Sequence, residues 1–175
     1  TDARDGIPTF SLSAVTDVQT VLDQLHVDLV HTLGWTQTVG DSGSASQTFK
    51  SPVGSYGASE NFTLNIQRAG VAAITTMQMI MTDGNGLLVN NVTTGHSHCF
   101  IDAAGSDVFI FAGNKPKPSI CVDYERAAAA PEIFYCCQLD RYPEVGVRPA
   151  WIFGCGPRNA AENLLIIYPV NEVYE

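Results

Sequence analysis

The segment His96-Ser97-His98-Cys99 holds the residue types that most readily bind a transition metal. Residues two apart on a strand point to the same side, and imidazole nitrogens suit zinc or copper. Two ligands on one face do not complete a site, so the others would have to come from His26, His31, Asp102 or a cysteine. A polar loop that leads into a strand at Cys99 explains the same residues without an ion. We favour that interpretation and expect no metal and no cofactor.

Two further segments suggest chemistry that their surroundings do not support. Gly40-Asp41-Ser42-Gly43 resembles the nucleophile loop of trypsin-like serine proteases, in which backbone amides stabilise an oxyanion. Those enzymes place the histidine and the aspartate far upstream, whereas one predicted helix is all that precedes Ser42. Asp83-Gly84-Asn85-Gly86 begins as a calcium loop does but lacks the terminal glutamate. Because Gly, Asp, Asn and Ser are ordinary turn residues, we expect two turns and no catalytic residue.

The chain has five cysteines, and their spacing fits neither a zinc finger nor a dense disulfide framework. An odd number means that at least one of them has no partner within the chain. Cys136 and Cys137 are adjacent on a predicted strand, so at most one of them faces the core. One possibility is a disulfide between subunits, with candidates Cys99, Cys136, Cys137 and Cys155. The other is that all five thiols, Cys121 included, are buried as small apolar groups or paired internally.

One segment has the periodicity of an amphipathic helix. Its apolar residues recur at steps of three and four, and they predict a helix over about residues 14–33. Thr16 and Gln19 fit a capping box, and Gly34 fits the left-handed residue that follows a helix. The helix face expected to pack on the β core consists of Val18, Leu22, Leu25 and Leu29. Residues 1–13 are expected to form an N-terminal arm, and residues 14–175 a single structural domain.

Downstream of Gly34 the pattern changes to short β-rich segments separated by Gly, Ser, Asn and Pro. Phe62, Leu64 and Ile66 alternate with polar residues, which indicates one buried and one solvated face. The predicted strands are Trp35–Val39, Gln47–Phe49, Asn61–Arg68, Ile74–Met81, Cys99–Ile101, Val108–Ala112, Ser119–Tyr124, Ile133–Leu139, Trp151–Phe153 and Leu164–Pro169. We therefore predict an α+β fold, mainly β, with an N-terminal amphipathic helix packed on an antiparallel sheet or sandwich.

Composition narrows the classes of partner. The 175 residues are 45% apolar and 15% charged, with a formal net charge of -9. This composition supports a sizeable core and excludes a wholly disordered chain. The negative charge opposes binding to phosphate backbones and anionic lipids, and no apolar stretch reaches the ~20 residues of a membrane helix. We expect neither nucleic acid nor a membrane as a partner.

Aromatic residues in the predicted strands leave a second interpretation open. They are Trp35, Phe134, Tyr135, Trp151 and Phe153. Such residues line the binding surface of carbohydrate-binding sandwiches. Core or interface packing is the commoner role of strand aromatics, because each one buries a large apolar area.

A series of motifs follows in a fixed order along the chain. They are Gly34-Trp35 after the helix, Phe49-Lys50-Ser51-Pro52, Gly54-Ser55-Tyr56-Gly57, the strand Glu60–Gln67, Val108–Pro116 with its Asn-containing turn, Ile120-Cys121-Val122, Phe134–Pro143, and Phe153-Gly154-Cys155-Gly156. This order, which covers about two thirds of the chain, resembles a family of tailed-bacteriophage virion structural proteins encoded among head-completion and tail genes. The chain departs from that pattern at Cys137, where a small residue is expected, and at His96 and Cys99.

The resemblance implies a non-enzymatic virion protein of the neck or tail, most simply a tail-completion (terminator) or collar subunit. Such a subunit would form a homo-oligomeric ring, contact other neck or tail proteins, and reside in the virion after assembly in the host cytoplasm. Head-to-tail contacts that close by rotation generate rings. A capsid decoration protein is the nearest variant. A carbohydrate- or receptor-binding sandwich of a phage fibre or secreted protein, and a metal-dependent enzyme around His96 and His98, are the alternatives from other classes.

Overall fold

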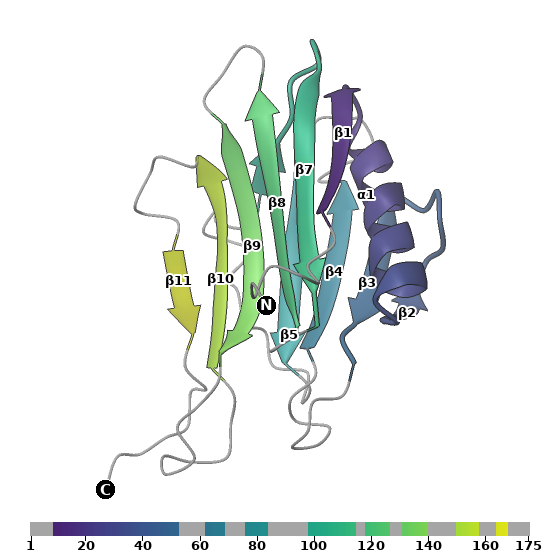
Figure 1. The fold of residues 1–175 in the computed structure, drawn as a ribbon, viewed down its shortest axis with the longest axis vertical. Helices are drawn as coiled ribbons and strands as arrows, with labels where there is room; N and C mark the ends of the chain where they lie inside the picture. The colour runs from purple at the N-terminus through teal and green to yellow at the C-terminus, as the bar shows by residue number, and fades with distance from the viewer. Residues whose placement is uncertain are drawn as a thin grey trace, which may run out of the picture.

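Two antiparallel β-sheets face one another across the core, and one helical segment packs beside them (Figure 1). This computed structural model describes residues 9–52, 62–68, 76–83, 98–114, 118–126, 131–139, 150–157 and 164–167. Within those residues, the six-stranded sheet has the order β1-β7-β8-β9-β10-β11 and the five-stranded sheet the order β2-β3-β4-β5-β6. The predicted class, an α+β fold that is mainly β, is confirmed.

The helical segment comprises α1 (Val18–His26) and the π-helical turn η1 (Val27–Thr32). The strands are β1 Thr9–Val15, β2 Thr36–Val39, β3 Ser46–Lys50, β4 Phe62–Arg68, β5 Thr76–Asp83, β6 His98–Phe100, β7 Ser106–Gly113, β8 Ser119–Arg126, β9 Glu132–Leu139, β10 Ala150–Pro157 and β11 Leu164–Ile167. Each of the ten predicted strands overlaps one of these. Strand β1 was not predicted from the sequence.

The order of strands along the chain explains both sheets. Strands β2 to β6 follow one another as a meander, and the connection after β6 leads to a second meander, β7 to β11. Strand β1 joins the second sheet at its edge by pairing antiparallel with β7, with Phe10 opposite Ile110 and Leu12 opposite Val108. Residues 9–13, which we expected to lie in an N-terminal arm, therefore belong to a strand.

The helix begins later than predicted. Ala14 and Val15 lie in β1, and Ala14 has a φ of 53°, which is outside the right-handed helical region. The N-cap is Asp17, whose carboxylate accepts a hydrogen bond of 2.8 Å from the backbone N–H of Gln19. The prediction of a capping box at Thr16 is therefore wrong. Aspartate caps a helix at least as well as threonine, so the helix begins after Asp17 instead.

The end of the helical segment is wider than an α-helix. The Leu33 N–H donates to the Asp28 carbonyl at 3.0 Å, five residues back, and the Trp35 N–H donates to the Leu29 carbonyl at 2.8 Å, six residues back. The second bond spans one residue more than the corresponding bond of a Schellman motif, as the π-turn requires. Gly34 has a φ of 72°, so the prediction of a left-handed residue after the helix is confirmed.

The core lies between the two sheets and under the helix. Val18, Leu22, Leu25 and Leu29 are each 0% exposed, and the helix lies beside β1 and β4 (Figure 1). The sheets contribute the buried side chains Phe49, Leu64, Ile66, Met77, Met79, Val108, Ile110, Ala112, Ile120, Val122, Tyr124, Phe134 and Cys136. Burying each large apolar side chain contributes roughly 1.5–3 kcal/mol to stability.

Candidate functional site

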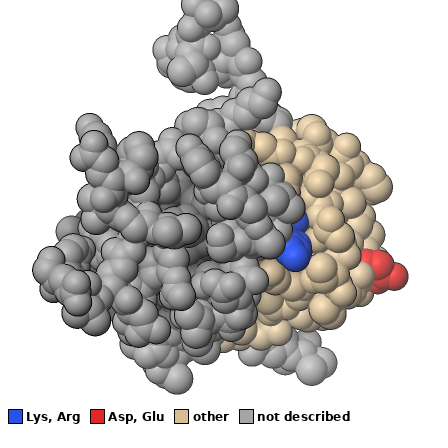
Figure 2. Space-filling model, turned by 90° about the horizontal axis from the view of Figure 1, so that it is seen from below, with Lys and Arg blue, Asp and Glu red and all other residues tan. Residues whose placement is uncertain are grey.

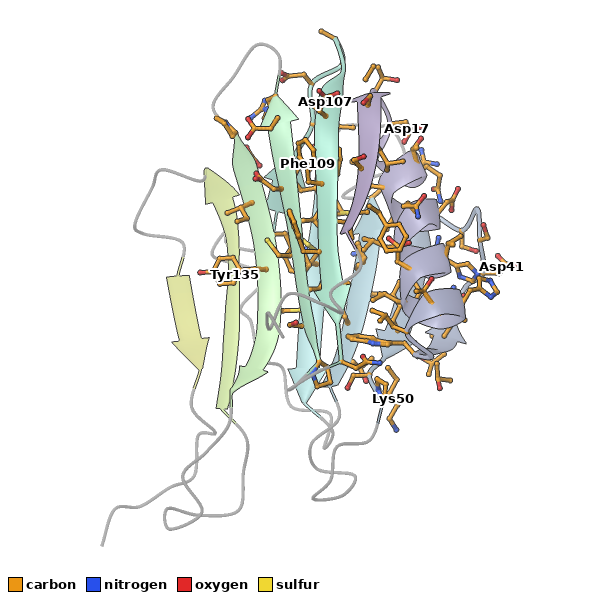
Figure 3. The ribbon with its side chains drawn as sticks, in the orientation of Figure 1. Asp17, Asp41, Lys50, Asp107, Phe109 and Tyr135 are labelled. Carbon is orange, nitrogen blue, oxygen red and sulfur yellow. The ribbon has the colours of Figure 1, made fainter. Side chains whose placement is uncertain are left out.

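The outer face of the six-stranded sheet carries apolar side chains, although a solvated sheet face is usually polar. In β7, β8 and β9 every second residue is buried, and the residues between them point outward. Five of these outward residues form what we call the aromatic face: Phe109, Phe111, Cys121, Ile133 and Tyr135. Phe111 is 38% exposed and the other four are half-buried. Figure 3 labels Phe109 and Tyr135 on this face, which is turned toward the reader.

Strand register makes the aromatic face continuous. Phe111 is paired with Cys121, which is paired with Tyr135, and Asp123 links Phe109 to Ile133 in the neighbouring row. Directly paired residues lie on the same face with Cβ atoms about 4.5–5.5 Å apart. The five apolar residues therefore form one patch across three adjacent strands.

Glycines extend the patch on its β10 side. Gly154 is paired with Tyr135, and Gly156 with Ile133. Because glycine has no side chain, β10 carries no Cβ next to these two residues. A partner can approach the sheet more closely there than over a larger residue.

Carboxylates gather at one end of the aromatic face. Asp107 at the start of β7 is paired with Glu125 near the end of β8, and Asp123 lies on the same face two residues before Glu125. Burial and, to a smaller extent, the charge of Asp123 together raise the pKa of the Cys121 thiol to about 11. At neutral pH this thiol is protonated, so Cys121 acts as a small apolar group rather than a nucleophile.

The outer face of the five-stranded sheet has a different character. Its half-buried residues on β3, β4 and β5 are mostly amides and hydroxyls bonded to one another, including Asn65 to the Thr48 hydroxyl and Gln67 to the Gln78 amide, each at 2.8 Å. Ile80 is the one apolar residue among the described outward positions of these three strands. Seen from below, the described surface is also mostly uncharged (Figure 2). The apolar character of the first sheet is therefore specific to that sheet.

The residues considered for a metal site do not converge in the described part of the chain. His26 and His31 lie edge to face with ring centroids 5.2 Å apart, whereas Asp102 bonds to Arg126. His96 and the side chains of His98 and Cys99 lie outside the described residues. No group of three or more His, Cys, Asp or Glu residues that could hold a metal occurs among the side chains described.

The loop around Ser42 is a docked turn. Its glycines Gly40 and Gly43 have φ angles of 74° and 89°, and the Gly43 N–H donates to the Asp23 carboxylate on α1 at 2.8 Å. Gln19 also donates to that carboxylate oxygen, at 2.9 Å. The Asp23 carboxylate thus holds the β2–β3 connection against the helix, while Ser42 is exposed. Of the segment Asp83–Gly86, Asp83 ends β5 and the rest lies outside the described residues.

An ion cluster joins the crossing between the sheets to β8 and β9. Arg126 donates through Nε and Nη2 to one oxygen of Asp102, at 3.2 and 3.0 Å, and through Nη1 to Glu132 at 2.9 Å. Its side chain is 19% exposed, and the carboxylates are 11% and 5% exposed. Charge-assisted contacts this well shielded from water hold the Ile101–Gly105 connection in place.

Two aromatic residues proposed for a sugar-binding surface lie in the core instead. Trp35 is 2% exposed and Phe134 is 0% exposed. The Trp35 indole N–H donates to Asn114 at 2.8 Å, and the Asn114 amide donates to the Leu33 carbonyl at 2.7 Å. These bonds tie the end of the helical segment to the end of β7. The side chains of Trp151 and Phe153 lie outside those described.

Among the candidate cysteines, Cys136 is fully buried in the core. A thiol in that position cannot reach the thiol of a neighbouring subunit, so Cys136 is removed from the candidates for a disulfide between subunits. Cys99, Cys137 and Cys155 lie on strands β6, β9 and β10, and their side chains are outside the described part.

The helical segment also contains a buried carboxylate that the sequence analysis did not single out. Asp28 in η1 is 0% exposed, and Gln24 donates to one of its oxygens at 2.7 Å. The other oxygen has no hydrogen-bond partner among the described residues. Burial raises the pKa of Asp28 from 3.8 to about 6, although the bond from Gln24 acts in the opposite direction.

The aromatic face was missed because it does not alternate as a solvated strand does. Residues 108–112 are apolar throughout, which is the pattern of a strand covered on both sides. That pattern was available in the sequence, but it does not say which of the two sides faces the core.

None of the helices described is long and apolar enough to cross a membrane. No protein-family model matches the chain, and neither the curated proteins nor the solved structures give a match. The features of the chain that bear on function are therefore the aromatic face, the polar clusters that join its elements and the order of motifs along it.

Proposed function

We propose that this protein is a non-enzymatic structural subunit of a tailed-phage virion, located in the neck or tail as a terminator, completion or collar protein. It assembles into a symmetric ring of identical subunits and contacts other neck or tail proteins. The observation that carries the proposal is the aromatic face, with Phe111 as its most exposed member. A contiguous apolar patch on the outside of a folded protein marks an interaction site.

The polar clusters support a structural role. The Asp23 carboxylate fastens a loop to α1, Arg126 fastens the crossing between the sheets, and Asn114 fastens the helical segment to β7. Each of these clusters joins one element to another. A subunit that bears load in a particle needs such cross-connections, whereas catalysis needs a nucleophile, base or metal beside a pocket.

Native mass spectrometry of the purified chain, combined with negative-stain electron microscopy, tests the proposal. We expect one closed species with an integral number of subunits and a central opening. A chain that remains monomeric at every concentration would contradict the ring. The variant Ser42→Ala should assemble as the wild type does, because Ser42 is exposed on a turn.

The same preparation separates the alternatives. Binding of a monomer to a glycan array would favour the carbohydrate- or receptor-binding sandwich, and binding of an oligomer to the outside of empty capsids would favour a decoration protein. Zinc or copper that co-purifies at about one ion per chain, and is lost in His98→Ala, would replace the proposal with a metal-dependent function.

A further inference from the structure

We propose that β1 is an exchangeable strand: it straightens at the bend around Ala14 and takes the place beside β7 in a second copy of this chain, which donates its own β1 in return. The contact uses the edge of the six-stranded sheet, whereas the aromatic face lies on the outside of that sheet. The exchange is therefore separate from the ring proposed above and does not require it.

The backbone at Ala14 is strained. Ala14 has a φ of 53°, and in the part of the chain that the structure describes it is the one non-glycine residue with a positive φ. In this left-handed region the Cβ of alanine comes too close to the following carbonyl oxygen. Thr16 and Asp17 are the two residues that join β1 to α1, so the connection is also short. Short connections under strain favour domain swapping, because the swapped form lets them straighten.

The strain lies in a β-bulge. Leu12 is opposite Val108 and Val15 is opposite Ser106, so between these pairs β1 has one residue more than β7. Bulges with a left-handed residue ordinarily have glycine there, because glycine adopts a positive φ without strain. Alanine at this position therefore makes the closed form of β1 less stable than the same bulge with glycine would be.

Two neighbouring residues hold the bend in place. The Ala14 N–H donates to the Asp107 carboxylate at 3.1 Å, and Figure 3 labels Asp107 at this end of β1. A Cβ at Gly105 would lie 3.3 Å from the Ala14 Cα, so the glycine leaves room for the bend. Strained backbone persists where the surrounding structure imposes it, and such strain is released when the segment moves away.

Strand β1 is also held less deeply than the strand beside it. Phe10 and Leu12 face the core but are half-buried, whereas the residues opposite them on β7 are 0% exposed. Ser11 and Ser13 are exposed. Elements with few buried side chains open at the lowest cost in free energy. When β1 opens, the edge of β7 is left unpaired, and an unpaired edge is a template for another strand.

A second copy fits that edge because its β1 makes the same pairs. Phe10 opposite Ile110 and Leu12 opposite Val108 fill inward-facing positions in either form. Residues 9–15 carry no charge, so the strand adds no like-charge contact although each chain has a net charge of -9. The closed and exchanged forms therefore differ mainly in the bend and in the cost of association. We expect exchange to increase with concentration.

Cross-linking between labelled and unlabelled chains tests the exchange. A photoreactive diazirine analogue of phenylalanine at position 10 faces the core, so it reaches the segment around Ile110 when β1 is paired with β7. Unlabelled chains and chains labelled with a heavy nitrogen isotope are mixed in equal amounts, incubated at high concentration and irradiated. We expect cross-linked peptide pairs that combine one labelled and one unlabelled peptide, and fewer of these mixed pairs after dilution.

Substitutions at Ala14 should shift the exchange in opposite directions. Glycine accepts a positive φ, so Ala14→Gly should lower the ratio of exchanged to closed chains about fivefold or more. Threonine is β-branched and favours extended backbone, so Ala14→Thr should raise that ratio. Ala14 is exposed, so both variants should fold.

The matched controls are Ala45→Gly and Ala45→Thr. Ala45 is also an exposed alanine, but its φ is not positive, so neither change should alter the fraction of mixed pairs. Equal effects at positions 14 and 45 would show that strain at the bend does not favour exchange, and would overturn the proposal.

The labels also separate the exchange from the ring. Cross-links that join like-labelled peptides alone, both after incubation and after the mixed chains are unfolded and refolded together, would overturn the exchange. Rings that form without mixed pairs would support the ring and exclude the exchange. Mixed pairs in a preparation without rings would support the exchange and count against the ring.

Discussion

The carboxylate of Asp28 makes stability depend on pH in an unusual direction. Its pKa is about 6 in the folded protein against an ordinary value of 3.8, so between these values the native state holds a proton that the unfolded chain has released. Stability therefore falls as pH rises through about 4 to 6. Above pH 6 the buried charge costs up to about 3 kcal/mol, since one pKa unit corresponds to about 1.4 kcal/mol.

Asp28→Asn removes that charge and should be more stabilising at pH 7 than at pH 4, by about 1–3 kcal/mol. Urea denaturation at the two pH values measures the difference. Thr32→Asn, an exposed change in the same helical segment, controls for the introduced amide. An effect of Asp28→Asn that is the same at both pH values would contradict the raised pKa.

The Asn114 side chain bonds to both the Trp35 indole and the Leu33 carbonyl, so removing it should lower the stability of the contact between β7 and the helical segment. Asn114→Ala removes the bonds to the Trp35 indole and the Leu33 carbonyl, and should cost about 1–3 kcal/mol of unfolding free energy. Asn114→Asp can still accept from the indole but cannot donate to the carbonyl.

Thermal and urea denaturation should therefore rank wild type above both variants at Asn114. A double-mutant cycle provides the control: in a Trp35→Phe background, Asn114→Ala should cost less, because one of its two bonds is already absent. Equal costs in the two backgrounds would show that the indole bond contributes nothing.

At the scale of the elements, the docked β2–β3 loop depends on two glycines that the structure distinguishes sharply. A Cβ at Gly40 would lie 2.4 Å from the Ser46 carbonyl oxygen, whereas at Gly43 nothing lies within 4 Å. Both residues have positive φ, so alanine pays a backbone cost of roughly 1–2 kcal/mol at either position.

Gly40→Ala should therefore destabilise the protein by clearly more than Gly43→Ala, which carries the backbone cost alone. Urea denaturation of the two variants makes the comparison. If both cost the same, the loop moves aside at Gly40 and is not held as tightly as the Asp23 contacts indicate.

The periodicity of apolar residues was enough to locate most elements, because each helix or strand must bury one face and so repeats apolar residues at a fixed spacing. Leu22, Leu25 and Leu29 fall on one side of a helix and Leu64 alternates with Thr63 and Asn65, so both kinds of element could be predicted. Helix ends depend on one capping side chain, and Asp17 and Thr16 offer similar oxygens one residue apart. The alternation of Phe10, Ser11, Leu12 and Ser13 was present but short, and the helix pattern next to it was stronger.

The candidate site was harder to foresee than the fold. The aromatic face depends on which strands pair and in which register. Phe111 and Tyr135 lie in one row because each is next to Cys121, and a local sequence pattern does not predict such pairings between distant residues. Cys136 and Cys137 show the same limit. Their adjacency predicted opposite faces, but the structure was needed to place Cys136 in the core.

At the scale of the whole molecule, the cluster of Arg126, Asp102 and Glu132 is a polar connection at the crossing from one sheet to the other. Arg126→Gln would remove the guanidinium that contacts both shielded carboxylates. Breaking a buried charge pair in this way typically costs about 3–5 kcal/mol.

Equilibrium unfolding in urea should show that loss for Arg126→Gln and a much smaller one for Arg68→Gln, which removes a half-buried arginine from the end of β4. Comparable losses at the two positions would mean that the cluster has no special role in joining the sheets.

The pairing of β1 with β7 also sets an order for events during synthesis. Ala14 and the Asp107 carboxylate that accepts its N–H are separated by 93 residues. At about 5–20 residues per second, a ribosome needs on the order of 5–20 s to make that stretch. Throughout that interval the first strand of the nascent chain has no partner, and the strands of the meander β2 to β6 are all made before β7 is. The N-terminal strand must therefore dock last among the early elements, and a chaperone that shields Phe10 and Leu12 would act in that window.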